Sequence, residues 1–247
     1  MSNSQTAQLD RACLRAGSAE LGLALMDEAV VGLEEYGMLL RVWNQRMNLV
    51  SKASLAHFET RHVLDSLTLV AAVDAPISGP VIDVGSGAGL PGLPLKIVFP
   101  EIDLTLVEAT AKKARFLEKA IEQLRLDSAR AVAERAEILA RDPEYRERFQ
   151  VVLARAIAPL PALVELTLPF CRQSGVVVAY KSRGVEGEVE EAGAAIKMLG
   201  GAPPRLIEVP ASVTGDPRVL VVIEKQEHTP EKYPRRPGMP TKQPLGV

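Results

Sequence analysis

Cysteine is scarce in this chain. Only Cys13 and Cys171 occur among its 247 residues, and two thiols so far apart provide neither a disulfide framework nor a zinc site. We therefore expect a protein without disulfides and without a bound metal ion, suited to a reducing compartment.

Long hydrophobic runs and an excess of one charge are absent as well. No basic segment followed by an apolar stretch begins the chain, and no run of about 18 uncharged apolar residues occurs, so we expect no membrane span and a cytoplasmic location. Lys plus Arg number 29 and Asp plus Glu 31, a net charge of −2. This balance does not favour a nucleic-acid partner, although a local basic patch can still bind one.

The composition is that of a folded globular protein. The chain is 47% hydrophobic and 24% charged, and its length suits one large domain with small additions. We predict a helical N-terminal extension at residues 1–75, an α/β domain at residues 76–227 and a basic, proline-rich tail at residues 228–247.

Hydrophobic periodicity locates the expected elements. From Met26 to Trp43 apolar residues recur at three- and four-residue steps, and residues 60–73 repeat the pattern. After Pro80, short apolar runs alternate with helical patterns. Strands are predicted at 80–84, 102–107, 129–133, 150–155, 175–181, 205–210 and 218–224. Helices are predicted at 92–99, 111–125, 135–141, 159–171 and 186–199.

The alternation of strands and helices predicts a parallel sheet with helices on both faces. The last two strands are separated only by the loop ASVTGDP, and they should form an antiparallel hairpin at one edge of the sheet. The expected architecture is therefore a Rossmann-like, seven-stranded α/β sheet with one antiparallel strand inserted. This is the arrangement of class I S-adenosylmethionine-dependent methyltransferases.

The segment VIDVGSGAGLPGLPL, Val81–Leu95, leads from the first strand into a helix through Gly85, Gly87 and Gly89. Glycines accept positive φ and let the backbone approach a ligand, and amides at the start of the helix point into the site. From Gly87 the segment also reads G-x-G-x-x-G, a dinucleotide fingerprint. Two cofactors are therefore candidates, a nicotinamide dinucleotide and S-adenosylmethionine.

Asp83 and two prolines favour S-adenosylmethionine. The strand ends at Gly85, too early for a fingerprint that begins at Gly87, and Pro91 and Pro94 delay the helix to about residue 92. A carboxylate two residues before the first glycine suits the ammonium group of S-adenosylmethionine, whereas it would repel a pyrophosphate.

Acidic residues follow the next two strands. Glu108, 23 positions after Gly85, can accept hydrogen bonds from both ribose hydroxyls of an adenosine. Arg135-Ala136-Glu137 borders the adenine position, where an amide and a carboxylate can read the amino edge of the base. Glu137 is equally explained as an acid at the start of a helix.

The segment VVLARAIAPL, at the end of the fourth strand, indicates the chemistry. It lacks the Asn/Asp-Pro-Pro-aromatic tetrad of adenine amino methylation, the cysteine nucleophile of cytosine C5 methylation and an acid for ribose 2′-O methylation. Guanine N7 needs no general base because its lone pair is free at neutral pH, so alignment can suffice. Arg155 and Lys181 are candidates for contacts to the guanine edge or to a phosphate.

Basic residues outside the sheet are further candidates for RNA contacts. Arg61 and His62 precede an apolar helix face, and Arg235, Arg236 and Lys242 lie in a tail that carries a net charge of +3 from residue 225 onward. These cations can contact phosphates. The sequence leaves open a tail that packs on the domain as a strap, and a His62 that is buried and satisfied.

Several blocks together resemble a known family. WNQRMNLV, RHVLDSL, the glycine loop with LPGLPL, EATAKKARFLE, RAE, ARAIAPL and the tail YPRRPGMPTKQPL are similar to those of the bacterial small-subunit rRNA guanine-N7 methyltransferase family RsmG, also called glucose-inhibited division protein B. The resemblance runs from about Tyr36 to Leu245. One departure is that Lys181 is followed by Ser182, where the family often has glycine.

The resemblance implies methylation of N7 of one guanine in a 16S rRNA loop near the decoding site. S-adenosylmethionine is the implied methyl donor, with S-adenosylhomocysteine as product and no metal. The implied substrate is 16S rRNA, in the 30S subunit or an assembly intermediate, and we expect a monomer. The implied cofactor contacts are Gly85, Leu90, Glu108, Ala109, Thr110, Ala136, Glu137 and Arg155.

Two alternatives stay open on the sequence. The first is a nicotinamide-dependent oxidoreductase, because the glycine loop also fits the dinucleotide fingerprint. The second is a ribosome-binding module that keeps the fold without catalysis.

Overall fold

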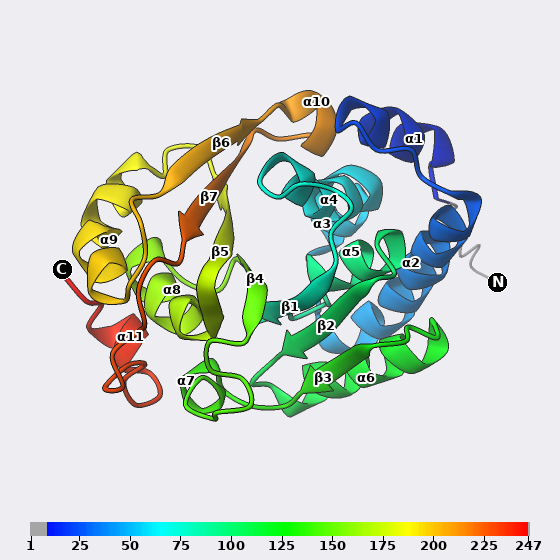
Figure 1. The fold of residues 1–247 in the computed structure, drawn as a ribbon. Helices are drawn as coiled ribbons and strands as arrows, with labels where there is room; N and C mark the ends of the chain where they lie inside the picture. The colour runs from blue at the N-terminus through cyan, green and yellow to red at the C-terminus, as the bar shows by residue number, and fades with distance from the viewer. Residues whose placement is uncertain (1–8, 247) are drawn as a thin grey trace.

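A computed structural model describes residues 9–246. Its centre is one seven-stranded sheet with the order β3-β2-β1-β4-β5-β7-β6 (Figure 1). All neighbouring strands are parallel except β7, which runs antiparallel to both β5 and β6. The predicted sheet and its terminal hairpin are confirmed. The strands are β1 (Gly79–Val84), β2 (Ile102–Val107), β3 (Ala129–Val132), β4 (Phe149–Arg155), β5 (Cys171–Ser182), β6 (Arg205–Val209) and β7 (Arg218–Glu224).

The register of the central strands brings three loops to one edge. Val84, the last residue of β1, pairs with Val107 of β2 on one side and with Ala154 of β4 on the other. Because the strand order reverses between β1 and β4, the loops that follow these strands diverge and leave a crevice between them. This edge is where a doubly wound sheet binds its ligand.

Helices cover both faces of the sheet. Side chains of adjacent strand residues point to opposite faces, so Val81 belongs to one hydrophobic cluster and Ile82 to another. The first cluster is closed by α2 (Asp27–Met47), α5 (Gly92–Val98) and α6 (Ala111–Gln123) (Figure 1). The second is closed by α8 (Leu160–Thr167) and α9 (Glu186–Met198), with the short α7 (Ala136–Leu139) beside them.

The described part of the N-terminal extension is helical, as predicted, and residues 1–8 lie outside the described residues. It contains α1 (Arg11–Glu20), α2, α3 (Lys52–Leu55), a π-helical turn (Glu59–Leu64), α4 (Asp65–Leu67) and a 3-10 turn (Thr68–Ala71). The predicted apolar stripe of α2 buries Leu33, Tyr36 and Leu40. These side chains share one cluster with Val81 of β1, so the extension is packed directly on the sheet.

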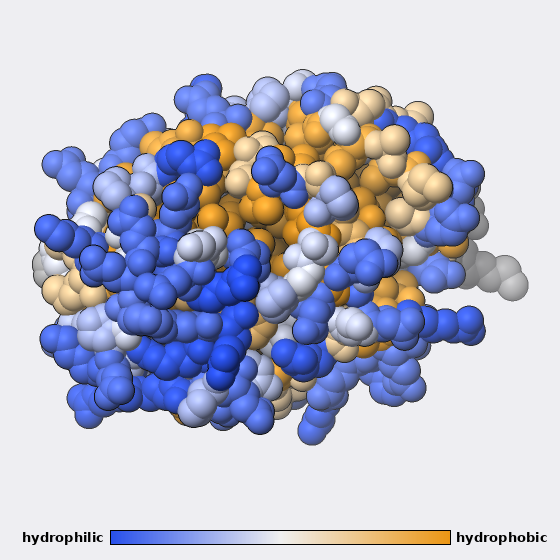
Figure 2. Space-filling view, viewed as in Figure 1, coloured by the Kyte–Doolittle hydropathy of each residue, from blue (hydrophilic) through white to orange (hydrophobic). Residues whose placement is uncertain are grey.

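Two segments contain more helix than the sequence indicates. The hairpin loop forms the short helix α10 (Ala211–Thr214), which begins after Pro210 and ends at Gly215, where φ is +79°. The tail contains α11 (Met239–Lys242), and Tyr233 of the tail is buried. The surface around α7 and α11, at the lower left of Figures 1 and 2, is hydrophilic.

Within residues 9–246, no helix is both long enough and apolar enough to cross a membrane.

Candidate functional site

The glycine loop makes a tight turn between β1 and α5. Gly85, Gly87 and Gly89 all have positive φ, at +72°, +56° and +84°, which favours glycine over any residue with a Cβ. The amides of Gly85 and Ser86 donate to the carbonyl of Val107 at 2.8 and 3.0 Å. The loop is therefore fastened to the end of β2.

The three glycines have different surroundings. A Cβ at Gly87 would meet nothing closer than 3.8 Å, so this glycine borders open space. A Cβ at Gly85 would lie 2.3 Å from Ile157, and one at Gly89 would lie 2.3 Å from Leu93. Gly89 is buried, and its smallness serves packing between the loop and α5. Leu90 is also buried, so its side chain supports the loop from within the core.

Asp83 is fully buried beneath the loop, and only one of its two carboxylate oxygens accepts a hydrogen bond from a described residue. Its Oδ2 accepts a hydrogen bond from the Gly92 amide at 3.0 Å, and no described residue donates to Oδ1. Burial raises the pKa of Asp83 to about 7, because a carboxylate loses solvation away from water. A buried acceptor without a donor suits the ammonium group of S-adenosylmethionine, and the contact that the sequence predicts there stays a prediction.

Glu108 lies across the mouth of the glycine loop. Its Oε2 accepts from the Gly87 amide at 3.1 Å and its Oε1 from the Thr110 amide at 2.7 Å. The side chain is largely buried, while Ala109 and Thr110 are exposed. This places a carboxylate at the end of β2, where an adenosine ribose would lie.

The turn Arg135–Glu137 follows β3 and begins α7. Glu137 is buried and its Oε1 accepts from Arg135 Nη2 and from the Gly238 amide, each at 2.8 Å. Ala136 is half-buried. The carboxylate of Glu137 is therefore occupied by the C-terminal tail, a contact between residues 101 positions apart that the sequence does not indicate.

Arg155, at the end of β4, reaches the N-terminal extension. One guanidinium nitrogen, Nη1, donates to Asp65 Oδ2 at 2.6 Å, and Nη2 lies 3.0 Å from His62 Nδ1. Asp65 is buried and its Oδ1 lies 3.1 Å from Nε of Arg218. The sequence did not single out Asp65 or Arg218, although Asp65 lies in the quoted block RHVLDSL.

His62 is buried, with 3% of its surface exposed. Burial, together with the positive charges of Arg155 and Arg61, lowers the pKa of His62 to about 3. Its ring is neutral at physiological pH and cannot neutralise an RNA phosphate. The expected RNA contact at His62 is thus limited to hydrogen bonding or stacking.

Beside the glycine loop lies a pocket of about 520 Å³, which we call the basic pocket. It is lined by the N-terminal extension, the ends of β4 and β5, and the starts of α9 and β7. Two of its lining residues, Asp65 and Glu188, are acidic and five are basic: Arg61, Arg155, Lys181, Arg183 and Arg218. The pocket therefore carries a positive charge that the whole-chain total of −2 hides.

Lys181 holds the loop between β4 and α8. Its Nζ donates to the Ala158 carbonyl at 3.0 Å and to Glu188 Oε2 at 2.7 Å, and the Leu160 amide donates to the same Glu188 oxygen at 2.6 Å. Within this loop Ala156 has a φ of +55°, an uncommon and strained conformation for alanine. Ile157 of the same loop lies against Gly85, so the loop separates the glycine turn from the basic pocket.

Two buried tyrosines join the N-terminal extension to the site. The hydroxyl of Tyr36 on α2 donates to the Ala88 carbonyl in the glycine loop at 2.8 Å. The hydroxyl of Tyr180 on β5 donates to the Ser66 carbonyl at 2.9 Å. The sequence indicates neither hydrogen bond, because the partners are 52 and 114 positions away.

Arg235 of the tail is paired within the protein. Its guanidinium forms a bidentate ion pair with the fully buried Glu165, with distances of 2.7 to 3.1 Å. The ion pair fixes this part of the tail on the domain, as the strap alternative expects, and an RNA contact at Arg235 stays a prediction. Arg236 and Lys242 are exposed.

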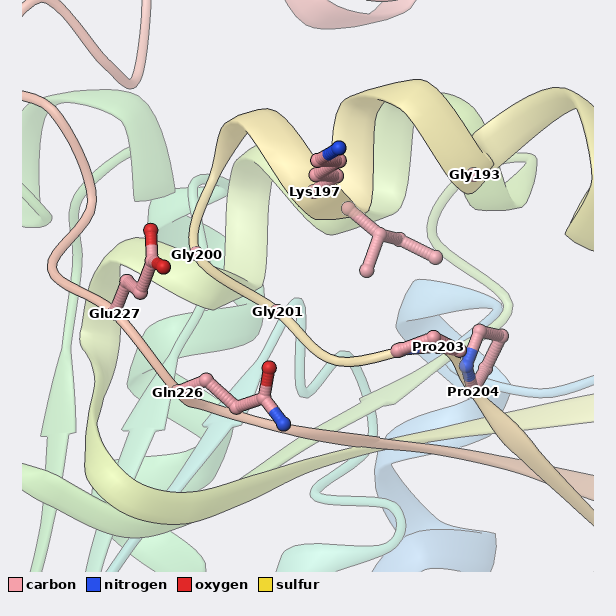
Figure 3. Close-up of a pocket in the computed structure, with 9 residues that line it drawn as sticks. Gly193, Lys197, Gly200, Gly201, Pro203, Pro204, Gln226 and Glu227 are labelled. Carbon is pink, nitrogen blue, oxygen red and sulfur yellow. The ribbon is translucent and has the colours of Figure 1, made fainter.

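A second pocket, of about 510 Å³, lies at the other end of the strands, before the start of β6 and after the end of β7. It is formed by the end of α9, residues 200–204 and the segment after β7 (Figure 3). The polar ends of Lys197, Gln226 and Glu227 lie apart from one another in Figure 3 and do not converge on a common point. Because ligands of doubly wound sheets bind at the carboxyl ends of the parallel strands, the glycine loop and the basic pocket form the candidate site.

The described residues include no group of three or more His, Cys, Asp or Glu side chains arranged to hold a metal ion.

Sequence comparison gives a consistent match. The family model GidB, described as rRNA small subunit methyltransferase G, matches residues 30–212. A protein of Pelotomaculum thermopropionicum named ribosomal RNA small subunit methyltransferase G is 43% identical over 232 residues, which cover 94% of this chain and 97% of that protein.

Solved structures share the fold. A Methanococcus maripaludis protein provisionally described as an S-adenosyl-L-methionine-dependent methyltransferase aligns with a TM-score of 0.54 at 13% identity, covering 72% of this chain and 90% of that one. A variant of MtNAS in complex with S-adenosylmethionine aligns with a TM-score of 0.52 at 17% identity, covering 90% and 80%. At these identities the two structures support the architecture alone.

Proposed function

This chain belongs to the rRNA small subunit methyltransferase G family, and we propose that it transfers the methyl group of S-adenosylmethionine to N7 of a guanine in 16S rRNA. The observation that carries the proposal is a juxtaposition. Ala156 lines the basic pocket, and the next residue, Ile157, lies against Gly85 of the glycine loop, where Asp83 has one carboxylate oxygen without a donor among the described residues.

The cofactor would be held by the ends of β1, β2 and β3. S-adenosylmethionine supplies a methyl group made electrophilic by a positively charged sulfur. Asp83 faces its ammonium group, Gly85 and Gly87 let the backbone approach it, and Glu108 accepts from the ribose hydroxyls. Ala109, Thr110, Ala136 and Glu137 complete the adenosine end.

The guanine would enter the basic pocket. N7 carries a free lone pair, so no side chain has to remove a proton, and the pocket needs only to align the base and exclude water. Arginine donates in a fixed fork to a guanine edge or a phosphate. Arg218 and Arg155 are oriented for this by Asp65, and Arg61 and Arg183 lie at the rim.

Lys181 has a supporting role in this reaction. Its ammonium group is committed to the Ala158 carbonyl and to Glu188, so it fixes the loop that separates donor from acceptor. Lys181 is thus proposed as a positioning residue, whereas the sequence suggested a contact to the guanine edge or to a phosphate.

We also propose that the enzyme acts as a cytoplasmic monomer on 16S rRNA within the 30S subunit or an assembly intermediate. A pocket opening beside several cations suits a folded RNA surface, since phosphate contacts position an RNA while the base is read in the site.

The test is methyl transfer from a labelled cofactor to 16S rRNA and, in parallel, to 30S subunits. We expect label in N7-methylguanine, with the preferred substrate showing whether free RNA or a particle is used. A folded protein that leaves no N7-methylguanine in either substrate contradicts the proposal. RNA binding without label would instead identify a non-catalytic ribosome-binding module.

A further inference from the structure

The C-terminal strap, residues 228–246, is fastened to the domain by two acids, the buried Glu165 and the half-buried Glu147. Glu165 on α8 is fully buried and accepts hydrogen bonds from the backbone amide of Arg235 at 2.7 Å and from its guanidinium. Glu147 accepts from the Thr229 amide at 2.7 Å and faces His228 Nδ1 at 2.6 Å. The strap is thus anchored at its start and at its middle.

Two arginines after α7 fasten the same segment from the other side. Arg141 donates to the carbonyls of Lys232 and Pro234, and Arg146 donates to that of Tyr233. Because these carbonyls belong to backbone outside helices and sheets, the guanidinium groups satisfy acceptors that would otherwise need water. In Figure 1 the strap runs beside α7 and α8, and α11 packs on α8.

The strap reaches the adenosine end of the site at Gly238. This glycine has a φ of +82° and its amide donates to Glu137 Oε1. Burial alone would raise the pKa of Glu137, but hydrogen bonds from Arg135 and Gly238 outweigh it and leave that pKa below its usual value. The carboxylate is thus charged, buried and directed to the strap.

We propose that the strap is a positioning element of the cofactor site. The Arg235–Glu165 ion pair fixes Gly238, and Gly238 holds the Glu137 carboxylate. Glu137 in turn fixes the turn whose backbone at Ala136 and Glu137 reads the adenine. This inference rests on the proposed function, because it requires an adenine at the end of β3.

The chemistry of adenine supplies a specific readout. Its Watson–Crick edge offers an acceptor at N1, which a fixed backbone amide at the start of α7 can match, and a donor at the 6-amino group. A 6-oxo ring reverses both positions. With the turn Arg135–Glu137 fixed by the strap, the protein should bind S-adenosylhomocysteine more tightly than S-inosylhomocysteine. When the turn is no longer fixed, the ratio of the two Kd values should fall.

The experiment compares Arg235→Ala with Arg236→Ala, a neighbouring arginine that is exposed. Calorimetric titration gives the Kd of both ligands for wild type and variants. We expect Arg235→Ala to weaken S-adenosylhomocysteine about tenfold, the loss of one to two hydrogen bonds, and the 6-oxo analogue less than about twofold. Arg236→Ala should change neither Kd.

Three results would overturn the inference. They are an unchanged Kd for S-adenosylhomocysteine in folded Arg235→Ala, an equal loss for both ligands, and an equal effect of Arg236→Ala. If Arg235→Ala does not fold, the same criteria apply to Arg235→Lys. This variant keeps the charge but cannot form a bidentate pair with Glu165. Wild type that binds neither ligand contradicts the proposed function, which is a different outcome.

Discussion

Asp83 combines two properties that rarely occur together in a residue without a function. It is fully buried, and one of its carboxylate oxygens has no donor among residues 9–246. Leaving a buried acceptor unpaired costs about 1–3 kcal/mol, and sites that bear such a cost are often ligand sites. Asp83 and the neighbouring glycines therefore allow predictions at the scale of single residues.

The affinity for S-adenosylhomocysteine should rise with pH. The pKa of Asp83 is raised to about 7 by burial, so the carboxylate is protonated below that pH and ionised above it. Only the ionised form attracts the ammonium group of the ligand. We expect Kd to fall about tenfold between about pH 6 and about pH 8, measured by calorimetry.

Asp83→Asn should abolish this pH dependence and weaken binding at the higher pH. Adenosine has no ammonium group, so it serves as a control whose Kd should stay constant for wild type over the same range. A Kd for S-adenosylhomocysteine that does not change with pH would refute the assigned contact.

Gly85→Ala should reduce methyl transfer far more than it reduces stability. Its Cβ would lie 2.3 Å from Ile157, and φ is +72°. Gly79→Ala is a matched control, because Gly79 has a φ of +79° but a Cβ there would meet nothing within 4 Å. Both variants should lose about 1–2 kcal/mol of unfolding free energy from the left-handed conformation.

Activity separates the two variants, since only Gly85→Ala displaces Ile157 from the glycine loop. We expect at least about a tenfold loss of kcat/KM for Gly85→Ala, in line with the effect of a misplaced reacting group, and close to wild-type values for Gly79→Ala. Equal activities would show that the contact between Ile157 and Gly85 is dispensable.

At the scale of elements, the site is supported from outside the glycine loop. The N-terminal helix α2 holds the loop through Tyr36, and the loop between β4 and α8 is held through Lys181 and Glu188. Each support connects two elements that are distant in sequence. Removing them should affect different kinetic constants. Tyr36 supports the glycine loop, which would hold the methyl donor, whereas Lys181 supports the loop beside the basic pocket, which would hold the guanine.

Tyr36→Phe should raise the KM for S-adenosylmethionine and leave kcat nearly unchanged. It removes the hydroxyl that donates to Ala88 and leaves a buried carbonyl unpaired, at a cost of about 1–3 kcal/mol. Tyr145→Phe is the control, because the ring of Tyr145 stacks on Phe149 in the cluster on the other face of the sheet, away from Tyr36. Steady-state kinetics with saturating RNA measure both, and equal KM values would contradict the role of α2.

Lys181→Met should lower kcat about tenfold or more, since it frees the loop that separates donor and acceptor. The Kd of S-adenosylhomocysteine should stay within about twofold of wild type, because Lys181 does not adjoin the cofactor end of the site. Lys197→Met, an exposed lysine on α9, is the control. If Lys181→Met instead weakened cofactor binding and left kcat unchanged, Lys181 would support the cofactor end of the site, and the prediction would be wrong.

At the scale of the whole molecule, charge is distributed unevenly. The chain carries −2 in total, yet five of the residues lining the basic pocket are cations. Attraction for RNA is therefore local, at the edge of the sheet where the glycine loop also lies. Binding of this kind weakens with salt, because each phosphate contact releases counterions.

Arg183→Ala should reduce the salt dependence of rRNA binding. Losing one phosphate contact lowers the slope of log K against log salt by about 0.7 for single-stranded RNA. Arg172→Ala is the control, because this exposed arginine lies near the start of β5, at the opposite edge of the sheet. Filter binding over a series of salt concentrations gives the slopes, and identical slopes for the two variants would argue against an RNA contact at the basic pocket.

The strands, the main helices and the glycine loop could be predicted from the sequence. These follow from period-two and period-3.6 patterns and from turn residues, which act over a few neighbours. It also placed Asp83 and Glu108 at strand ends, where a doubly wound sheet binds ligands. The pairing of distant polar groups depends on the packed fold, as for Asp65 with Arg155, Glu165 with Arg235 and Glu137 with the backbone amide of Gly238. Among 29 cations and 31 acids nothing local selects a partner 90 positions away, as Arg155 is from Asp65; the packing of the elements does.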